Sequence, residues 1–292
     1  MVGARLCLAV AALLALGASL PSAACADELY GTLAKIRDSG RIALGYRESS
    51  IPFSYLNDAG EPEGYTIELC LRVVETIEAE LRLDDLAVEM VPVTPETRIP
   101  LLLDGTIDLE CGSTTNSLSR EEQVDFSHII FITGTKLLVR QGSGIGEIED
   151  LEGKAIALTR GTTNEAVVKD LVAAKGLDLE ILEVADHAEA FRALESDQVA
   201  AYASDLILLH GLISQANDPG SYAAVGRFLS YEPYALMVRR DDSAFRLVVD
   251  RTLSELFRSG EILDIYAEWF GPLGVPRSDL LEAAFVLQAL PE

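Results

Sequence analysis

Hydrophobic and polar positions along the first half of the chain alternate in blocks that predict strands followed by helices. Short apolar runs at residues 41–45, 87–92 and 106–110 predict buried strands. Between the first two runs, residues 64–82 place apolar side chains on one helical face, and residues 95–103 predict a shorter helix. Strands that alternate with helices are typical of an α/β lobe.

The same alternation restarts after residue 133. Apolar runs predict strands at residues 135–140, 155–158, 181–184, 199–203 and 234–238. Amphipathic patterns predict helices that begin near residues 163 and 187, and two more at residues 247–257 and 262–270. A chain of 292 residues is near the upper limit for one hydrophobic core, so the pattern predicts two lobes.

Polar loops follow the predicted strands in both halves. They occupy residues 46–55, 94–98 and 112–120 in the first half, and residues 159–163, 186–187 and 205 in the second. In open α/β sheets, ligands bind beyond the carboxyl ends of the strands. Two such edges that face each other would form a ligand-binding cleft. The loop at residues 159–163 also precedes a helix, whose free N–H groups favour an anion.

One of these loops has the chemistry of a carboxylate site. Ser113, Thr114, Thr115 and Asn116 precede Arg120, so hydroxyls, amides and a guanidinium lie close together. A guanidinium binds a carboxylate through two parallel hydrogen bonds, and hydroxyls complete the shell. The alternative is an ordinary polar loop that caps a short helix, and the loop by itself does not decide between the two.

The charge balance narrows the classes of partner. The chain has 47 acidic and 23 basic residues and a formal net charge of −24. This charge argues against nucleic acid and against anionic membrane surfaces as partners. Any anion site must therefore be built from a few locally placed cations. The histidines and cysteines have no metal-ligand spacing, so we expect neither a metal nor another cofactor.

Residues 1–26 have the pattern of a cleaved signal peptide. Arg5 precedes an apolar stretch over residues 6–20 that is too short to span a bilayer, and small residues end at Ala26. We expect cleavage after Ala26 and a soluble, periplasmic mature protein. Lipid anchoring at Cys25 is an alternative, but Ser22 stands where a lipoprotein signal would carry an aliphatic residue.

Two cysteines, Cys70 and Cys111, remain after cleavage. Cys70 lies in a predicted helix that could pack on the strand ended by Cys111. An oxidising compartment permits a disulfide between them. Two buried thiols that pack as small apolar groups are the other interpretation.

An ordered set of motifs resembles one known family. The motifs are Gly45–Tyr55, Arg98–Leu102, Glu110–Asn116, Asp125–Ser127, Gly161–Thr163, Asp186-His187, Phe191–Ser196 and Trp269-Phe270. With these motifs, the chain resembles the periplasmic solute-binding proteins of polar amino acid ABC transporters, and among these the glutamate/aspartate-binding branch.

The resemblance implies the α/β, two-lobed type II periplasmic-binding-protein fold. Each lobe would be a mostly parallel sheet flanked by helices, and two hinge strands would join the lobes. The implied division assigns residues 27–132 and 233–292 to the first lobe and residues 133–232 to the second.

The resemblance also implies a set of ligand contacts for an acidic L-amino acid. Arg120 would bind the α-carboxylate with Thr115 and Thr162, and Ser113 and Asp205 would hold the ammonium. The residues implied for the side-chain carboxylate are Arg47, Arg98, Thr163 and His187. Members of the branch carry a serine three residues before the second arginine, where this chain has Pro95.

The resemblance implies a monomeric binding protein, without catalysis, that serves ABC transporter permease subunits in the inner membrane. Two alternatives remain open at this stage. One is a dehydratase of the prephenate or arogenate type on the same fold, although the sequence contains no evident catalytic constellation. The other is a sensor module for an amino acid.

Overall fold

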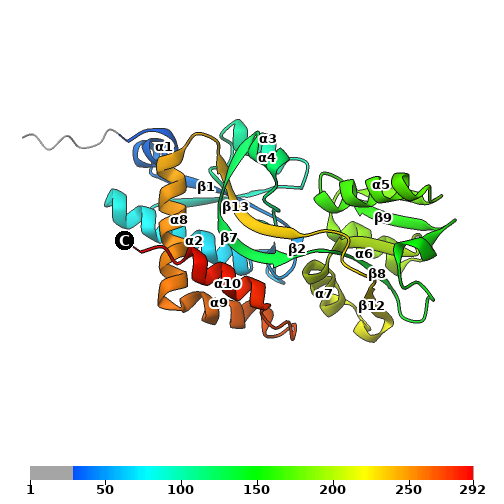
Figure 1. The fold of residues 1–292 in the computed structure, drawn as a ribbon. Coiled ribbons are helices and arrows are strands. Elements are labelled where there is room, and N and C mark those ends of the chain that lie inside the picture. Colours follow the sequence, from blue (N-terminus) through cyan, green and yellow to red (C-terminus); the bar gives the residue numbers. More distant parts are fainter. Residues whose placement is uncertain (1–28, 292) are drawn as a thin grey trace, which may run out of the picture.

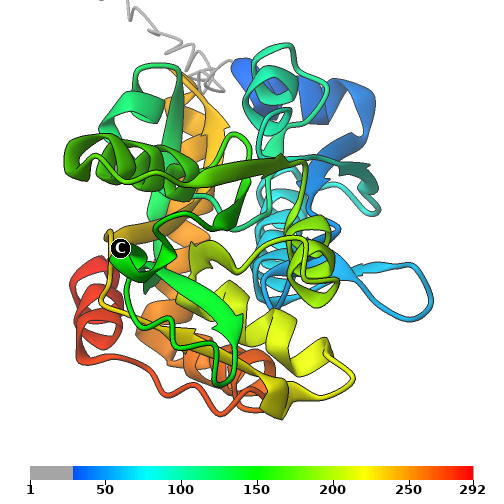
Figure 2. The same ribbon diagram turned by 90° about the vertical axis from the view of Figure 1, so that its right-hand side faces the viewer.

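The computed structural model describes residues 29–291, so the predicted signal peptide and Cys25 lie outside the described residues. Two α/β lobes, each built on a five-stranded sheet, lie next to each other and are joined by two extended crossings (Figure 1). Figure 2 shows the molecule with the second lobe toward the viewer.

The sheet of the first lobe has the strand order β5-β1-β6-β13-β7. Its strands are β1 (Arg41–Tyr46), β5 (Ala87–Pro92), β6 (Leu109–Glu110), β7 (Val124–Thr133) and β13 (Glu232–Arg239). Strands β5, β1 and β6 are parallel, whereas β13 runs antiparallel to both β6 and β7. A small antiparallel sheet contains β2 (Ser49–Ser50), β3 (Ser54–Leu56) and β4 (Pro62–Glu63).

The sheet of the second lobe has the order β10-β9-β11-β8-β12, in which β10, β9 and β11 are parallel and β8 runs antiparallel to both of its neighbours, β11 and β12. Its strands are β8 (Thr135–Arg140), β9 (Ala155–Thr159), β10 (Glu180–Val184), β11 (Ala201–Asp205) and β12 (Tyr222–Val225). Each lobe therefore has a mixed sheet whose parallel strands direct their carboxyl ends toward one edge.

Helices flank both sheets. Those of the first lobe are α1 (Gly31–Ser39), α2 (Tyr65–Leu81), α3 (Arg98–Leu103), α4 (Leu118–Glu121), α8 (Ser243–Ser259), α9 (Glu261–Phe270) and α10 (Asp279–Gln288). Those of the second are α5 (Thr163–Lys175), α6 (His187–Glu195) and α7 (Leu206–Gln215), with short 3-10 turns at Ile148–Leu151 and Pro219–Ser221. The sequence did not predict α1, α7, α10 or β12, and it predicted a loop over residues 46–55, where the structure has β2 and the start of β3; β4 was not predicted either.

The two crossings are the continuous path from β7 to β8 and the entry into β13. Glu232 at the start of β13 pairs with Thr133 at the end of β7, so the crossings are adjacent strands where they leave the first lobe. This pairing favours the lobe boundaries that we predict near residues 132 and 232, which remain a prediction.

Both crossing strands are anchored in an aromatic cluster of the first lobe. Phe131 of β7 lies 5.0 Å from Phe53 and 4.8 Å from Phe270 between ring centroids. Tyr234 of β13 lies 5.1 Å from Phe53. All four rings are buried. Close aromatic pairs stabilise a fold by more than the apolar area that they bury. We therefore expect the two crossing strands to bend outside this cluster.

Cys70 and Cys111 form a disulfide with a Cα–Cα distance of 6.2 Å. Cys70 lies in α2, and Cys111 directly follows β6, so the bridge ties helix α2 to the polar loop that begins at Gly112. Of the two interpretations that the sequence allowed, the disulfide is therefore the one present.

Replacing both cysteines, Cys70→Ala with Cys111→Ala, is expected to lower the free energy of unfolding by about 2–5 kcal/mol. The reason is chain entropy, because the bridge closes a loop between residues 41 positions apart in the unfolded state. Urea unfolding followed by circular dichroism measures the loss. The wild type in reductant is the control and should match the double variant, and equal midpoints for variant and oxidised wild type would contradict the expectation.

Candidate ligand-binding site

A small, narrow cavity between the lobes brings the predicted ligand contacts together. Its lining contains all nine of them, Arg47, Arg98, Ser113, Thr115, Arg120, Thr162, Thr163, His187 and Asp205, together with Asn164 and Leu208. The structure therefore places the nine residues around one cavity, whereas their contacts with a ligand remain a prediction.

Parallel strands explain why these side chains meet. Arg47 follows β1, and Ser113 follows β6, each at the carboxyl end of its strand. In the second lobe Thr162 follows β9 and Asp205 ends β11, again at carboxyl ends. Polar loops at this edge of each sheet face each other across the cavity, which is the arrangement expected of open α/β sheets.

The three arginines supply a concentrated positive charge that is almost fully buried. Arg47 and Arg98 are each 2% exposed and Arg120 is 8% exposed. Burial, and secondarily the charge of Arg98, lower the pKa of Arg47 to about 10 and the pKa of Arg120 to about 9. All three guanidinium groups therefore remain charged at neutral pH.

Few hydrogen bonds within the protein satisfy these guanidinium groups. Arg120 donates to the carbonyl oxygen of Thr115 at 2.8 Å and, across the cavity, to that of Gly161 at 3.2 Å. Arg98 donates to Thr114 Oγ1 at 2.6 Å, while its Nε has no partner. For Arg47, residues 29–291 provide neither a side-chain hydrogen bond nor an ion pair.

Asp205 is the one predicted acidic residue of the site. Its Oδ1 accepts from Asn164 Nδ2 at 2.8 Å, and its Oδ2 accepts from the Tyr234 hydroxyl. Burial, with a smaller effect from the Glu232 carboxylate, raises the pKa of Asp205 to about 7. Although Asp205 precedes α7, its side chain forms no capping hydrogen bond, so its carboxylate is directed into the site instead.

Two further buried carboxylates, Glu110 and Glu232, were missed by the sequence reasoning. Glu110 is fully buried, its Oε2 accepts from Thr114 Oγ1 at 2.7 Å, and its Oε1 has no partner. Glu232 is 2% exposed and accepts from the hydroxyls of Thr115 and Thr163. Three carboxylates rather than one thus accompany the three guanidinium groups.

Thr162 caps α5, and this limits the role predicted for it. Its Oγ1 accepts from the Glu165 N–H at 3.1 Å and donates to the Thr159 carbonyl oxygen at 2.7 Å. The hydroxyl therefore has no proton left to donate to a ligand. The first N–H groups of α5, those of Thr163 and Asn164, have no intrahelical acceptor and give this end of the cavity a partial positive charge.

His187 contributes a neutral imidazole. It is 2% exposed, and its Nδ1 lies 2.5 Å from the Tyr202 hydroxyl, which also contacts Thr159 Oγ1 at 3.0 Å. Burial, followed by the charges of Arg47 and Arg98, holds the pKa of His187 well below its usual value of 6.5.

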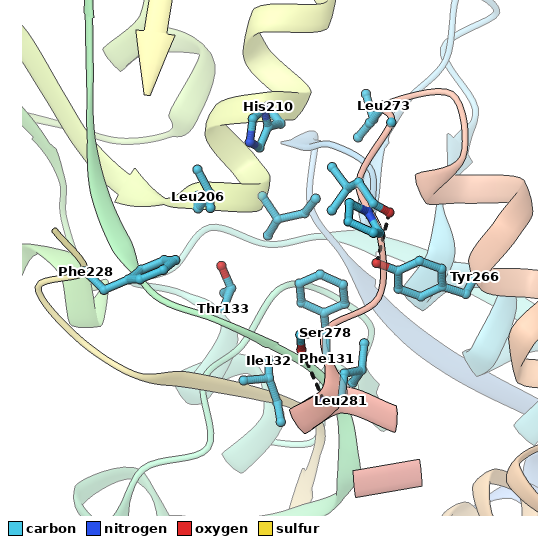
Figure 3. A pocket seen from close by; sticks show the side chains of 14 residues that line it. Phe131, Ile132, Thr133, Leu206, His210, Phe228, Tyr266, Leu273, Ser278 and Leu281 are labelled. Atoms are coloured by element: carbon cyan, nitrogen blue, oxygen red, sulfur yellow. Dashed lines mark hydrogen bonds between the residues drawn. The ribbon is translucent and has the colours of Figure 1, made fainter. Parts of the chain in front are cut away.

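A second cavity, of about 340 Å³, lies beside the crossing strands (Figure 3). It is lined mainly by apolar side chains from both lobes, among them Phe131, Leu206, Phe228 and Leu281. Its lining contains no arginine, lysine, aspartate or glutamate. Although larger, it lacks the charges that a zwitterion requires, and the small charged cavity is the better amino acid site.

No group of side chains within residues 29–291 has the composition of a metal site. In the same range, no helix is both long enough and apolar enough to cross a membrane.

Two α/β lobes with a charged ligand cavity between them define a solute-binding protein of the type II fold. Residues 42–272 match the sequence profile of the bacterial extracellular solute-binding proteins, family 3, and the chain belongs to this family.

The chain is 46% identical over 246 residues to the L-glutamate/L-aspartate-binding protein of Pseudomonas aeruginosa, an alignment that covers 84% of this chain and 82% of that protein. It is 39% identical over 258 residues to the glutamate/aspartate import solute-binding protein of Escherichia coli, with 88% and 85% covered. The crystal structure of the ancestral amino acid-binding protein AncCDT-1, a precursor of cyclohexadienyl dehydratase, superposes with a TM-score of 0.71 at 26% identity, covering 82% of this chain and all of that one.

His187 is expected to stay neutral when the pH falls from about 8 to about 5.5. In the unfolded chain the imidazole takes up a proton near pH 6.5, whereas burial and two guanidinium groups oppose that proton in the folded protein. The ring signals in an NMR titration should therefore not shift over this range, with His187→Gln used for assignment. A midpoint near pH 6.5 would show that the ring is solvated.

Proposed function

We propose that the protein binds an acidic L-amino acid, glutamate or aspartate, between its lobes and delivers it to the permease of an ABC transporter. The observation that carries this proposal is Arg47, a buried guanidinium without a hydrogen-bond or ion-pair partner in the described chain. A buried guanidinium whose donors have no acceptor is costly even with the Glu110 carboxylate nearby, and a ligand carboxylate would supply that acceptor. The names of the Pseudomonas and Escherichia relatives support the same ligand class.

The α-carboxylate is assigned to Arg120 and the backbone of Thr115. Thr115 forms a β-bridge with Tyr234, and the flanking N–H groups of Asn116 and Ala235 make its hydrogen bonds. In such a pair the N–H of Thr115 points away from β13. We therefore assign the donor function of Thr115 to its N–H, and that of the α5 end to the N–H groups next to Thr162.

The ammonium group is assigned to Asp205 and Ser113. Asp205 supplies the opposite charge, and Ser113 Oγ is buried without a hydrogen-bond partner, so it is available as an acceptor. An ammonium group beside Asp205 would lower the pKa of that carboxyl and keep it ionised at neutral pH.

The side-chain carboxylate is assigned to Arg47, Arg98, Thr163 and His187. The two guanidinium groups provide most of the charge, and the unpartnered Nε of Arg98 is a free donor. His187 donates a single hydrogen bond because it is neutral. Thr163 acts through its N–H at the start of α5.

We further propose that the protein acts in the periplasm as a monomer and catalyses no reaction. The two relatives are named as binding proteins, and AncCDT-1 is itself described as amino acid-binding, which favours capture over turnover. Turnover of labelled prephenate by the purified protein would favour the dehydratase alternative.

L-Glutamine is expected to bind about 100- to 4000-fold more weakly than L-glutamate. Its amide would leave Arg47 and Arg98 enclosed without the ligand carboxylate as a bonded partner, and leaving a buried charge unpaired costs about 3–5 kcal/mol. Isothermal titration calorimetry with both amino acids measures the difference. A thermal-shift screen of the twenty amino acids is the companion test, and equal affinity for the two ligands would remove the acidic-ligand assignment.

Arg120→Ala and Arg98→Ala are expected to differ in selectivity. Arg120→Ala should weaken acidic and neutral amino acids alike because every ligand has an α-carboxylate, whereas Arg98→Ala should weaken only the acidic ones. Each of these substitutions is expected to lower the binding affinity at least tenfold, which is the effect of losing one charged hydrogen bond. Arg192→Ala in α6, an exposed position, is the matched control. A uniform loss from Arg98→Ala would contradict the division of roles.

A further inference from the structure

Glu232 is a buried carboxylate at the point where the chain crosses from the second lobe to the first. Its Oε2 accepts hydrogen bonds from Thr115 Oγ1 and from Thr163 Oγ1, both at 2.6 Å. Thr115 belongs to the polar loop after β6, and Thr163 is the first residue of α5. One oxygen atom thus joins a residue of each lobe, next to the ligand cavity.

The other oxygen of Glu232 is held by a chain of hydrogen bonds that ends at Asp205. Ser230 Oγ donates to Glu232 Oε1 at 2.5 Å and contacts Thr135 Oγ1 at 2.7 Å. Asn164 Nδ2 donates to both Thr135 Oγ1, at 2.6 Å, and Asp205 Oδ1, at 2.8 Å. The Asn164 amide nitrogen only donates and Ser230 gives its proton to Glu232, so the Thr135 hydroxyl donates to Ser230 Oγ.

We propose that Glu232 is a positioning residue that latches the two lobes together in the closed form by accepting the hydroxyl protons of Thr115 and Thr163. The proposal rests on the proposed function, since it assigns a role to residues around that ligand site. Separation of the lobes must break at least one of the two hydrogen bonds.

The latch also determines how the two threonines meet a ligand. A hydroxyl has one proton, and in both threonines that proton is given to Glu232. Their oxygens can then only accept from a ligand, as from an ammonium group, while carboxylates are left to the guanidinium groups and the backbone N–H donors. Glu232 thereby restricts the two threonine hydroxyls to the ammonium end of an amino acid and leaves its carboxylates to the other donors.

The test is the dissociation rate of L-glutamate, measured by stopped-flow fluorescence in two variants with the same charge. Glu232→Gln retains an oxygen that accepts from both threonines, whereas Glu232→Ala removes it. Glu232→Ala is expected to release L-glutamate about tenfold faster than Glu232→Gln, the effect of one hydrogen bond of this kind. The association rates should agree within about twofold, because the latch forms after the ligand enters. Equal dissociation rates in the two variants would overturn the latch.

Thr163→Val supplies the second measurement, because valine keeps the shape and the N–H while it removes the hydroxyl. If Glu232 acts through Thr163, adding Thr163→Val to Glu232→Ala should raise the dissociation rate of L-glutamate by at most about threefold. If the two residues acted independently, the rate increases of the two single variants would multiply in the double variant. Multiplicative effects would overturn the proposal. Failure of the wild type to bind L-glutamate would overturn only the proposed function, because the same rates can then be measured with the amino acid that the thermal-shift screen identifies as the ligand.

Discussion

Three like charges held in one buried cavity are the constraint on which the rest of the structure depends. Arg98 acts on both Arg47 and Arg120 by repulsion, and burial adds to the cost of each charge. The arrangement persists because carboxylates offset the charges without bonding to them: Glu110 acts on Arg47 and Arg98, and Glu232 and Asp205 act on Arg120. These carboxylates have hydrogen-bond partners of their own, so they do not collapse onto the guanidinium groups. The protein thus keeps its cations near their counter-ions but leaves their donors free.

The crossing strands connect this cavity to the packing of the first lobe. Tyr234 lies in the aromatic cluster with Phe53 and Phe131, yet its hydroxyl reaches Asp205 in the second lobe. Two residues earlier on β13, Glu232 binds threonines from both lobes. One strand therefore carries both the anchor that resists deformation and the polar groups that sense the position of the second lobe. In the proposed closure, ligand contact and the latch are coupled because they use neighbouring residues of the same strand.

Much of this fold could be predicted from the sequence, because apolar residues recur with the periods typical of strands and of amphipathic helices. Helix α7 escaped because its run of Leu206, Ile207 and Leu208 is apolar on every side, so no helical face stands out. The ligand cavity was predictable from polar loops at strand ends together with the family motifs. Glu110 was not, since a carboxylate within a short strand is ordinarily solvent-facing and only its neighbours in the fold reveal its burial. The disulfide could not be decided either, because sequence spacing does not give the distance between α2 and the end of β6.

The overall charge of the protein and the charge of its proposed ligand have the same sign, and this decides where selectivity arises. A net charge of −24 repels an anion at long range, but salt at physiological strength screens exposed charges beyond about 8 Å. Inside the cavity the low dielectric makes each guanidinium–carboxylate pair far stronger than it is in water. The protein therefore has no general attraction for anions. A small anion without an ammonium group would leave the Asp205 carboxylate without an opposite charge. Recognition requires both signs of charge in one ligand at a fixed separation, which an acidic amino acid supplies and inorganic anions do not.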